Sequence, residues 1–283
     1  ELIEKIDIGG VSLLRAAAKN HYDVTVVSHF SQYETIALEL NETKGMISYE
    51  TRRKLAGISF QKTSAYDALI QEYFTGFGGP AVAYPVKNSL RYGENPHQKA
   101  VWHTSEKPVF EKLSGKELSY NNLLDIDAAI QLINEFNECT FAIIKHNNAC
   151  GIASRLTVKQ SYRAALQADT ISPFGGILIC NREIDNEATE LIKDLFFEVI
   201  IAPSYQFEAL NKLKEKPNRI ILKTLQAERN TKTYRSILNG MLEQESDNKS
   251  SVETDLKTVT QIAPTSSEIE DLLFAEKIAK HTK

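Results

Sequence analysis

The alternation of short apolar runs with longer helical stretches constrains the fold of this 283-residue chain most strongly. Runs of four to six apolar or β-branched residues are typical of strands, and apolar residues recurring every three to four positions are typical of helices. The expected strands are 23–28, 140–144, 176–180, 199–202 and 219–222, and the expected helices are 11–21, 32–40, 50–74, 122–136, 157–168, 186–195 and 267–280. This order predicts an α/β fold built from doubly wound layers.

A stretch rich in glycine and proline interrupts the alternation at residues 75–90, TGFGGPAVAYPVKNSL. Both residue types break regular structure, so we predict a linker there. The expected domains are therefore residues 1–74 and 91–283. The polar stretch 243–257 predicts a loop or the tip of a surface hairpin.

Charge and composition exclude several classes of protein. The chain has 33 Lys and Arg residues against 37 Asp and Glu residues, so its net charge is −4 and no basic field favours nucleic acid. No apolar run reaches the length of a membrane helix, and the start, ELIEK, does not resemble a signal peptide. Because the three cysteines form no CxxC pair, we expect reduced thiols and a cytoplasmic protein. The chain begins without methionine and in mid-pattern, which we interpret as the sign of a fragment.

The densest chemical signal is TFAIIKHNNACGIAS, residues 140–154, where an apolar strand runs into Lys145 and His146. Ligands of open α/β sheets bind beyond the carboxyl ends of strands. Neighbouring strand residues point to opposite faces, so the pair can share one site only if the backbone leaves β geometry there. Lys145 and His146 are then an acid/base candidate; the alternative is a surface lysine beside a histidine hydrogen-bonded in a turn. His146 and Cys150 lack a second pair at zinc spacing, so we expect no metal.

Two further segments are candidate binding elements. In RYGENPHQ, residues 91–98, Arg91 could clamp a phosphate and Tyr92 could stack on a planar ring, although a solvated turn would also explain the segment. In KIDIGG, Asp7 precedes a glycine turn at a helix start, and Lys19 follows two to three helical turns later. The alternative there is a helix cap with a surface lysine.

Seven segments, taken in order, carry a resemblance that covers practically the whole chain. They are KIDIGGVSLLRAAAKNH (5–21), ETRRKLA (50–56), RYGENPHQ (91–98), NNLLD (121–125), KHNNACG (145–151), SPFGG (172–176) and EVIIAPSY (198–205). Together they resemble the bifunctional purine-biosynthesis family, phosphoribosylaminoimidazolecarboxamide (AICAR) formyltransferase/IMP cyclohydrolase, in its bacterial form. Two departures from the commoner pattern, 147–150 and Pro173, would change loop rigidity without deleting a functional group.

The resemblance implies a fold and catalytic residues for each domain. Residues 1–74 resemble the rear part of a methylglyoxal-synthase-like cyclohydrolase domain, in which Asp7 and Lys19 match the catalytic aspartate and lysine. Residues 91–283 resemble an incomplete cytidine-deaminase-like transformylase domain without the deaminase zinc ligands. Lys145 and His146 match its catalytic pair. The implied reactions are formyl transfer from 10-formyltetrahydrofolate to AICAR and cyclisation of the formylated product, FAICAR, to IMP.

The resemblance also implies substrate contacts and partners. Six positions match residues that hold the nucleotide substrate: Arg91, Tyr92, Asn122, Phe174, Gly175 and Glu198. Folate is implied as a cosubstrate, with no metal, and the family works as a homodimer. Two alternatives stay open, which are a catalytically inactive truncated product and an effector-binding module.

Overall fold

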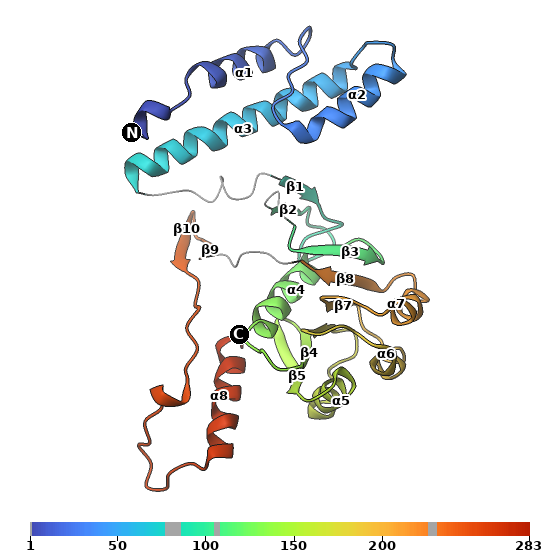
Figure 1. The fold of residues 1–283 in the computed structure, drawn as a ribbon, viewed down its shortest axis with the longest axis vertical. Helices are drawn as coiled ribbons and strands as arrows, with labels where there is room; N and C mark the ends of the chain where they lie inside the picture. Colours follow the sequence, from blue (N-terminus) through green and yellow to red (C-terminus); the bar gives the residue numbers. More distant parts are fainter. Residues whose placement is uncertain (1, 77–85, 105–107, 226–230) are drawn as a thin grey trace. The chain divides into compact units, whose positions relative to one another are not determined.

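A computed structural model describes residues 2–76, 86–104, 108–225 and 231–283 (Figure 1). The chain divides into two compact units, Glu1–Lys87 with His103–Glu106, and Asn88–Trp102 with Lys107–Lys283. Most of the predicted linker, residues 77–85, lies outside the described residues. Its last part forms strand β1 (Val86–Ser89), which joins β2 (Val101–Thr104) in a small two-stranded sheet.

Helices make up the first unit between residues 2 and 76. They are η1 (Ile3–Lys5), α1 (Gly9–Lys19), η2 (Phe30–Gln32), α2 (Tyr33–Glu42) and α3 (Tyr49–Thr75). The Ser48 hydroxyl caps the start of α3 by accepting the N–H of Thr51, and Gly76 ends it with a φ of 72°. A small apolar cluster of Ala18, Val26, Leu55 and Ala56 joins α1 to α3.

The strand predicted at 23–28 is wrong, and so is a doubly wound layer within residues 2–76. Residues 24–28 form no regular secondary structure, and no strand is present in residues 2–76 to pair with them. An extended segment becomes a strand only when a neighbour satisfies its backbone hydrogen bonds. Here Val26 packs its side chain into the small apolar cluster instead.

A six-stranded mixed sheet forms the centre of the second unit, in the order β3-β8-β7-β6-β4-β5. Its strands are β3 (Phe110–Ser114), β4 (Thr140–Lys145), β5 (Asn148–Ser154), β6 (Ile177–Cys180), β7 (Val199–Ala202) and β8 (Ile220–Thr224). Strands β6, β7 and β8 are parallel, whereas β4 runs antiparallel to both β5 and β6, and β3 runs antiparallel to β8. The α/β class is thus confirmed, with a mixed sheet.

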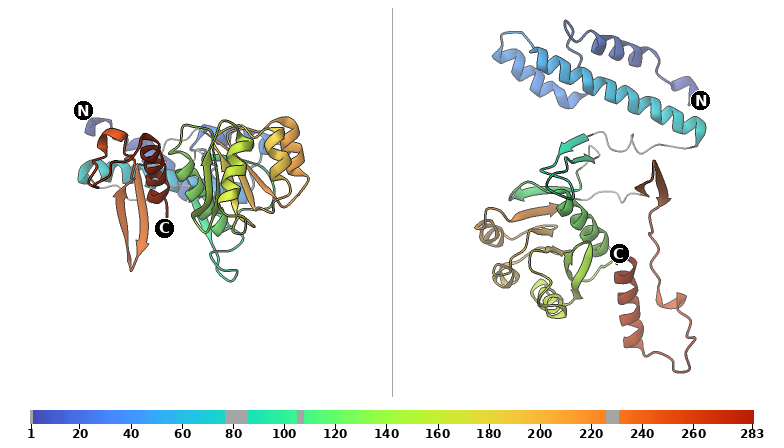
Figure 2. Two further views of the ribbon diagram at one scale, coloured as in Figure 1. Left: turned by 90° about the horizontal axis from the view of Figure 1, so that it is seen from below. Right: turned by 180° about the vertical axis from the view of Figure 1, so that it is seen from behind.

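Helices cover both faces of this sheet (Figure 1 and Figure 2). On one face, α5 (Val158–Ala168), α6 (Asn186–Ile192) and α7 (Phe207–Lys214) pack against Phe141, Ile143 and their neighbours. On the other face, α4 (Tyr120–Ile133) and α8 (Ser266–Lys280) pack against the alternate residues, among them Ala142 and Ile144. Because both faces are buried, the central parts of these strands are apolar, as the short runs in the sequence predicted.

Several elements were not predicted. Strands β3 and β5 and helix α7 belong to the sheet domain, and β9 (Lys232–Ile237) pairs with β10 (Gly240–Glu245) in a separate hairpin. Of the two alternatives for 243–257, the hairpin tip is wrong, and the loop is confirmed from residue 246 onward apart from a short 3-10 turn. Residues 243–245 lie in β10, and the chain turns at Leu238, whose φ is 52°.

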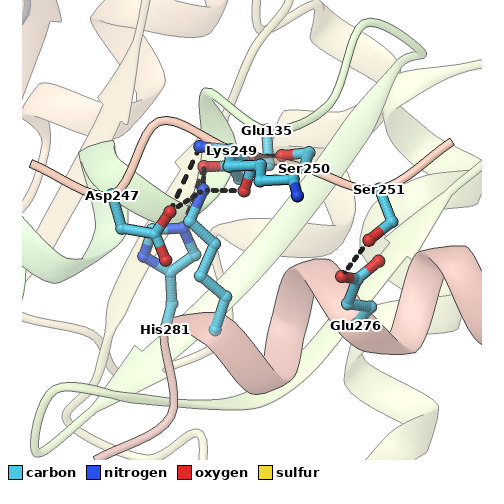
Figure 3. A network of polar contacts seen from close by, with 8 residues as sticks. Glu135, Asp247, Lys249, Ser250, Ser251, Glu276 and His281 are labelled. Carbon is cyan, nitrogen blue, oxygen red and sulfur yellow. Dashed lines mark hydrogen bonds and ion pairs between the residues drawn. The ribbon is translucent and has the colours of Figure 1, made fainter. Parts of the chain in front are cut away.

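Helix α8 is fixed to the sheet domain by a buried polar network (Figure 3). The carboxylate of Glu135 accepts hydrogen bonds from the Ser250 hydroxyl at 2.7 Å, from Lys280 Nζ at 3.1 Å and from His281 Nε2 at 3.1 Å. Only 7% of the Glu135 side chain and 12% of the Lys280 side chain are exposed. This buried ion pair joins the end of α8 to the segment that follows α4.

None of the helices in the described residues has both the length and the apolar character needed to span a membrane.

Candidate functional site

Lys145 and His146 lie where β4 ends. The edge of the six-stranded sheet that is formed by the strand ends on this side is called the sheet edge below. Because β4 runs antiparallel to β6, this edge also holds the amino ends of the parallel strands β6, β7 and β8. As expected, the pair lies at the carboxyl end of its own strand, β4, but the neighbouring parallel strands run in the opposite direction. The site instead combines the end of one reversed strand with the segments that lead into β6 and β7.

His146 and Asn147 form the tight turn between β4 and β5. Their φ angles are 52° and 64°, and the flanking residues Lys145 and Asn148 face each other across the hairpin. Two consecutive positive φ angles in a two-residue loop match the twist of the paired strands, and His and Asn tolerate this conformation better than most residues. The backbone leaves β geometry at this point, which is the condition for Lys145 and His146 to share one site. The turn carries His146 out to the surface, where its side chain is exposed.

The loop between α5 and β6 holds the Lys145 side chain. Lys145 Nζ donates a 2.9 Å hydrogen bond to the carbonyl oxygen of Phe174. Asp169 folds this loop by accepting the N–H groups of Ile171 and Ser172, each at 2.9 Å. Backbone anchoring of this kind fixes the position of the ammonium group relative to the strand end.

Phe174 and Gly175 lie side by side in that loop. The Phe174 ring, 64% exposed, packs against Phe196 with 4.8 Å between ring centroids. Gly175 has a φ of 76°, a conformation that glycine adopts at low cost, and its N–H donates to the Phe196 carbonyl at 2.8 Å. The structure thus brings both predicted binding residues next to Lys145.

Glu198 and Asn122 meet at the amino end of β7. Asn122 Nδ2 lies 3.3 Å from Glu198 Oε2, and Lys116 Nζ lies 2.9 Å from the same oxygen. Partial burial would raise the pKa of Glu198, but the hydrogen bonds from Lys116 and Asn122 and the positive charge of Arg91 lower it below its usual value. Glu198 is therefore a carboxylate at neutral pH, surrounded by donors and cations.

The segment 91–98 is a compact loop beside α4. The N–H of Gly93 donates to the Gln98 carbonyl at 2.7 Å, and the Asn121 side chain donates to the Glu94 carbonyl at 3.2 Å. The guanidinium of Arg91 lies over the ring of Tyr92, 5.1 Å from its centroid. The bond from Asn121 places the loop that carries Arg91 beside the first turn of α4, which also carries Asn122.

Helix α4 connects the group around Glu198 to the turn that carries His146. Ser119 and Asn122 cap its first turn reciprocally, which fixes the start of the helix beside Glu198. Asp125 lies one turn further on, and its Oδ1 accepts the N–H of Asn147 at 2.7 Å. The arrangement is thus continuous from Lys116 and Glu198, along α4, to the turn that carries His146.

Asp7 and Lys19 lie in the first unit, and the structure does not bring them together. Asp7 Oδ1 accepts the N–H of Gly10 at 2.8 Å and so caps the start of α1. Lys19 is exposed in the last turn of the same helix. At about 1.5 Å per residue, the helix separates its two ends by roughly 15 Å. Either residue could act on a substrate, but they do not contact each other.

Within the described ranges, no three His, Cys, Asp or Glu side chains gather where they could hold a metal ion. The side chains at the sheet edge offer a histidine as acid or base, cations for anionic groups and carboxylates for N–H donors.

Comparison with known proteins identifies the family. The pattern of the AICARFT/IMPCHase bienzyme family matches residues 17–283. The chain belongs to this family. Three similar relatives, each named bifunctional purine biosynthesis protein PurH, match over the full length of the chain. The protein of Bacteroides thetaiotaomicron is 50% identical over 285 residues, that of Chlorobium phaeobacteroides 43% over 303 residues, and that of Bacillus subtilis 41% over 297 residues.

This member of the AICARFT/IMPCHase bienzyme family spans a little over half the length of those relatives, with 56% of the first and 58% of the other two matched. The matches confirm the resemblance on which the predicted residues depend. The names of these relatives assign no role to any residue, so the residue roles that the resemblance implies stay predictions.

Two residues of the site were not predicted from the sequence. Lys116 lies in the connection between β3 and α4 and touches Glu198. Asp125 lies under the His146 turn. No periodicity marks either residue, although Asp125 stands within the NNLLD segment that contributed to the resemblance.

Proposed function

We propose that the protein containing this chain catalyses the last two steps of de novo purine biosynthesis. In the first step a formyl group passes from 10-formyltetrahydrofolate to the 5-amino group of AICAR, which gives FAICAR. In the second step FAICAR closes to IMP with loss of water. The observation that carries this proposal is the Lys145–His146 pair at the end of β4, with His146 in a left-handed turn, in a chain of the AICARFT/IMPCHase family. Helix α4 connects this turn to Asn122 and Glu198.

Formyl transfer requires removal of a proton from a weakly nucleophilic amine. The amine nitrogen bonds to the formyl carbon, the bond from that carbon to the folate nitrogen breaks, and one proton moves from the amine towards the folate. His146 is exposed and suited to accept the amine proton, and cationic Lys145 is suited to stabilise the tetrahedral oxyanion or to assist the leaving nitrogen.

The remaining residues of the edge are suited to hold AICAR. Arg91 would bind the phosphate and Tyr92 the planar ring. Asn122, Phe174 and Glu198 would contact the base and ribose, and Gly175 leaves room beside the Phe174 ring. Because Glu198 is a hydrogen-bond acceptor at neutral pH, it suits the N–H groups or hydroxyls of this substrate.

The cyclisation step is proposed for the first unit. The carboxamide nitrogen of FAICAR attacks its formyl carbon, and water leaves. An aspartate such as Asp7 can orient the amide, and a lysine such as Lys19 can stabilise the oxyanion or donate a proton. Their separation along α1 supports roles at different parts of a nucleotide rather than a contacting pair.

We also propose the finer fold assignment and the assembly. Residues 1–74 would be the rear part of a methylglyoxal-synthase-like domain, and residues 91–283 part of a cytidine-deaminase-like domain, with residues 75–90 as the linker. The complete protein would be a cytosolic homodimer. The family and the mixed α/β sheet of the second unit support this assignment.

Expression of the complete reading frame and assay of tetrahydrofolate formation from 10-formyltetrahydrofolate and AICAR tests the proposal. His146→Ala should lower formyl transfer by about 10²- to 10⁴-fold, because it removes the acid/base group, and should leave cyclisation of supplied FAICAR unchanged. Lys19→Ala should do the reverse. His103→Ala, at an exposed histidine outside the sheet edge, is the matched control.

Parallel loss of both activities in either variant would contradict the assignment of two separate sites. Absence of both activities in a folded protein would favour an effector-binding module, since such a module needs no acid/base group.

A further inference from the structure

The turn that carries His146 is tied to helix α4 by the side chain of Asp125. Its two residues, His146 and Asn147, both have positive φ angles, and neither is a glycine. A conformation that costs energy persists only where surrounding contacts determine it. Two side-chain hydrogen bonds hold the backbone of this turn: Asn148 Nδ2 donates to the His146 carbonyl at 2.9 Å, and the Asn147 N–H donates to Asp125 Oδ1 at 2.7 Å. Only the second bond ties the turn to a helix.

Asp125 is well placed to act as this support. It lies on α4, one helical turn after Asn122, whose own side chain reaches Glu198. The buried residues Ile126 and Ala129 fix α4 on the sheet, so the carboxylate projects from a rigid element. A side chain on a packed helix positions its partner more accurately than one on a loop.

The surroundings of the Asp125 carboxylate favour its hydrogen bond with the Asn147 N–H. Burial raises the pKa of the Asp125 carboxyl, and only the Asn147 N–H and the charge of His146 oppose that shift. In the part of the chain that the structure describes, no lysine or arginine forms an ion pair with Asp125. A half-buried carboxylate without an ion-pair partner is costly, so a specific hydrogen bond has to offset that cost.

We propose that Asp125 is a positioning residue for His146, because its carboxylate accepts the Asn147 N–H and thereby holds the left-handed turn that presents the imidazole. This inference rests on the proposed formyl transfer and extends it to a residue that would not contact the substrate. Asp125 acts on the backbone of the turn, so its loss displaces the imidazole without removing it. Misplacement of a catalytic group by about 1 Å can cost a hundredfold in rate.

The activity test uses three variants of the protein expressed from its complete reading frame. Asp125→Ala removes the acceptor, and it should lower kcat of formyl transfer by roughly ten- to hundredfold while KM for AICAR stays within about threefold. Asp125→Asn keeps an oxygen that can accept the same N–H, and it should restore kcat to within about threefold of the wild type. Asp127→Ala is the matched control, because Asp127 is exposed on the same helix and its carboxylate accepts a hydrogen bond from its neighbour Gln131.

A second measurement does not depend on activity. Hydrogen exchange of the Asn147 amide should be at least about fivefold faster in Asp125→Ala than in the wild type, and protected again in Asp125→Asn. Cyclisation of FAICAR and the melting temperature should be the same in all three variants.

The outcomes separate this inference from the proposed function. If His146→Ala abolishes formyl transfer but Asp125→Ala leaves kcat unchanged, the positioning role is overturned and the proposed function stands. Equal losses in Asp125→Ala and Asp125→Asn would also overturn it. If the folded wild type transfers no formyl group, the proposed function fails, and unchanged Asn147 exchange in Asp125→Ala would then overturn the positioning role as well.

Discussion

Replacing Glu135 by glutamine should loosen helix α8 without unfolding the sheet domain. The Glu135 carboxylate accepts three hydrogen bonds, two of them from the basic side chains of Lys280 and His281 (Figure 3). Glutamine has nearly the same shape but no charge, so the substitution leaves Lys280 largely buried without its carboxylate.

The size of the effect follows from these contacts. Removing one partner of a buried ion pair costs about 3–5 kcal/mol. The lower value applies here, because Lys280 keeps the Lys249 carbonyl at 3.0 Å and Asp247 lies 3.9 Å away. A loss of about 3 kcal/mol in the docking of α8 corresponds to roughly a hundredfold change in its undocking equilibrium.

Hydrogen exchange with mass spectrometry on peptides from residues 266–280 measures this equilibrium. We expect α8 to exchange about a hundredfold faster in Glu135→Gln, while peptides from β4 and β7 stay protected. Glu276→Gln is the control, because Glu276 lies on the same helix and accepts a 2.6 Å hydrogen bond from Ser251 at an exposed position. Its effect should stay within about 0.5 kcal/mol. Equal exchange of α8 in the two variants would refute the reasoning.

The pH dependence gives an independent check. Burial would raise the pKa of Glu135, but the hydrogen bonds from Ser250, His281 and Lys280 lower it below its ordinary value of 4.5. A carboxyl whose pKa is lower in the folded state stabilises that state fully above its unfolded pKa, and this contribution disappears as pH falls through the folded pKa. Docking of α8 should therefore weaken below about pH 4.5 in the wild type, and this weakening should be absent in Glu135→Gln.

Three further outcomes follow from single contacts. Gly151→Ala would place a methyl group on the carbonyl oxygen of Ala165, so it should lower the free energy of unfolding in urea by about 1–3 kcal/mol. Tyr205→Phe removes hydroxyl bonds to two strand carbonyls, at 3.1 and 2.7 Å, and should cost about 1–2 kcal/mol in the same assay. Lys116→Met removes the main donor that lowers the pKa of Glu198, so carbon NMR of that carboxyl should show its pKa raised, and an unchanged pKa would contradict the contact.

Much of the sheet domain could be predicted because its central strands are short apolar runs buried on both faces. Strands β4, β6, β7 and β8 were found in this way. Strand β5, NACGIAS, was missed because its small and polar residues carry no periodic signal. The direction of β4 was also missed, since it depends on pairing with β6, a contact between distant parts of the sequence.

The wrongly predicted strand at 23–28 also shows that strand pairing cannot be predicted from local sequence. Its alternating β-branched residues fit a strand, but periodicity describes only one partner of a pair. Pairing needs a second strand, and residues 2–76 contain none.

The candidate site was predictable where a residue type stands out locally. Lys145 and His146 do so because two basic residues follow an apolar strand. Asp125 does not, because its significance arises from a hydrogen bond to a residue 22 positions along the chain. Lys116 likewise gains its role only when β3 and β7 are brought to the same edge.

The position of β3 in the sheet affects the order in which the strands can pair during synthesis of the chain. Strand β3 lies at the edge of the sheet and pairs with β8, where Ser114 faces Ile221. A ribosome adding about 5–20 residues per second would finish β3 roughly 5–20 s before its partner is made. The β4–β5 hairpin, in contrast, closes within a few residues of chain. Of the described strands in this sheet, β3 therefore stays unpaired for the longest time during synthesis. The part of the site next to β3, which includes Lys116, forms only after β8 has been made.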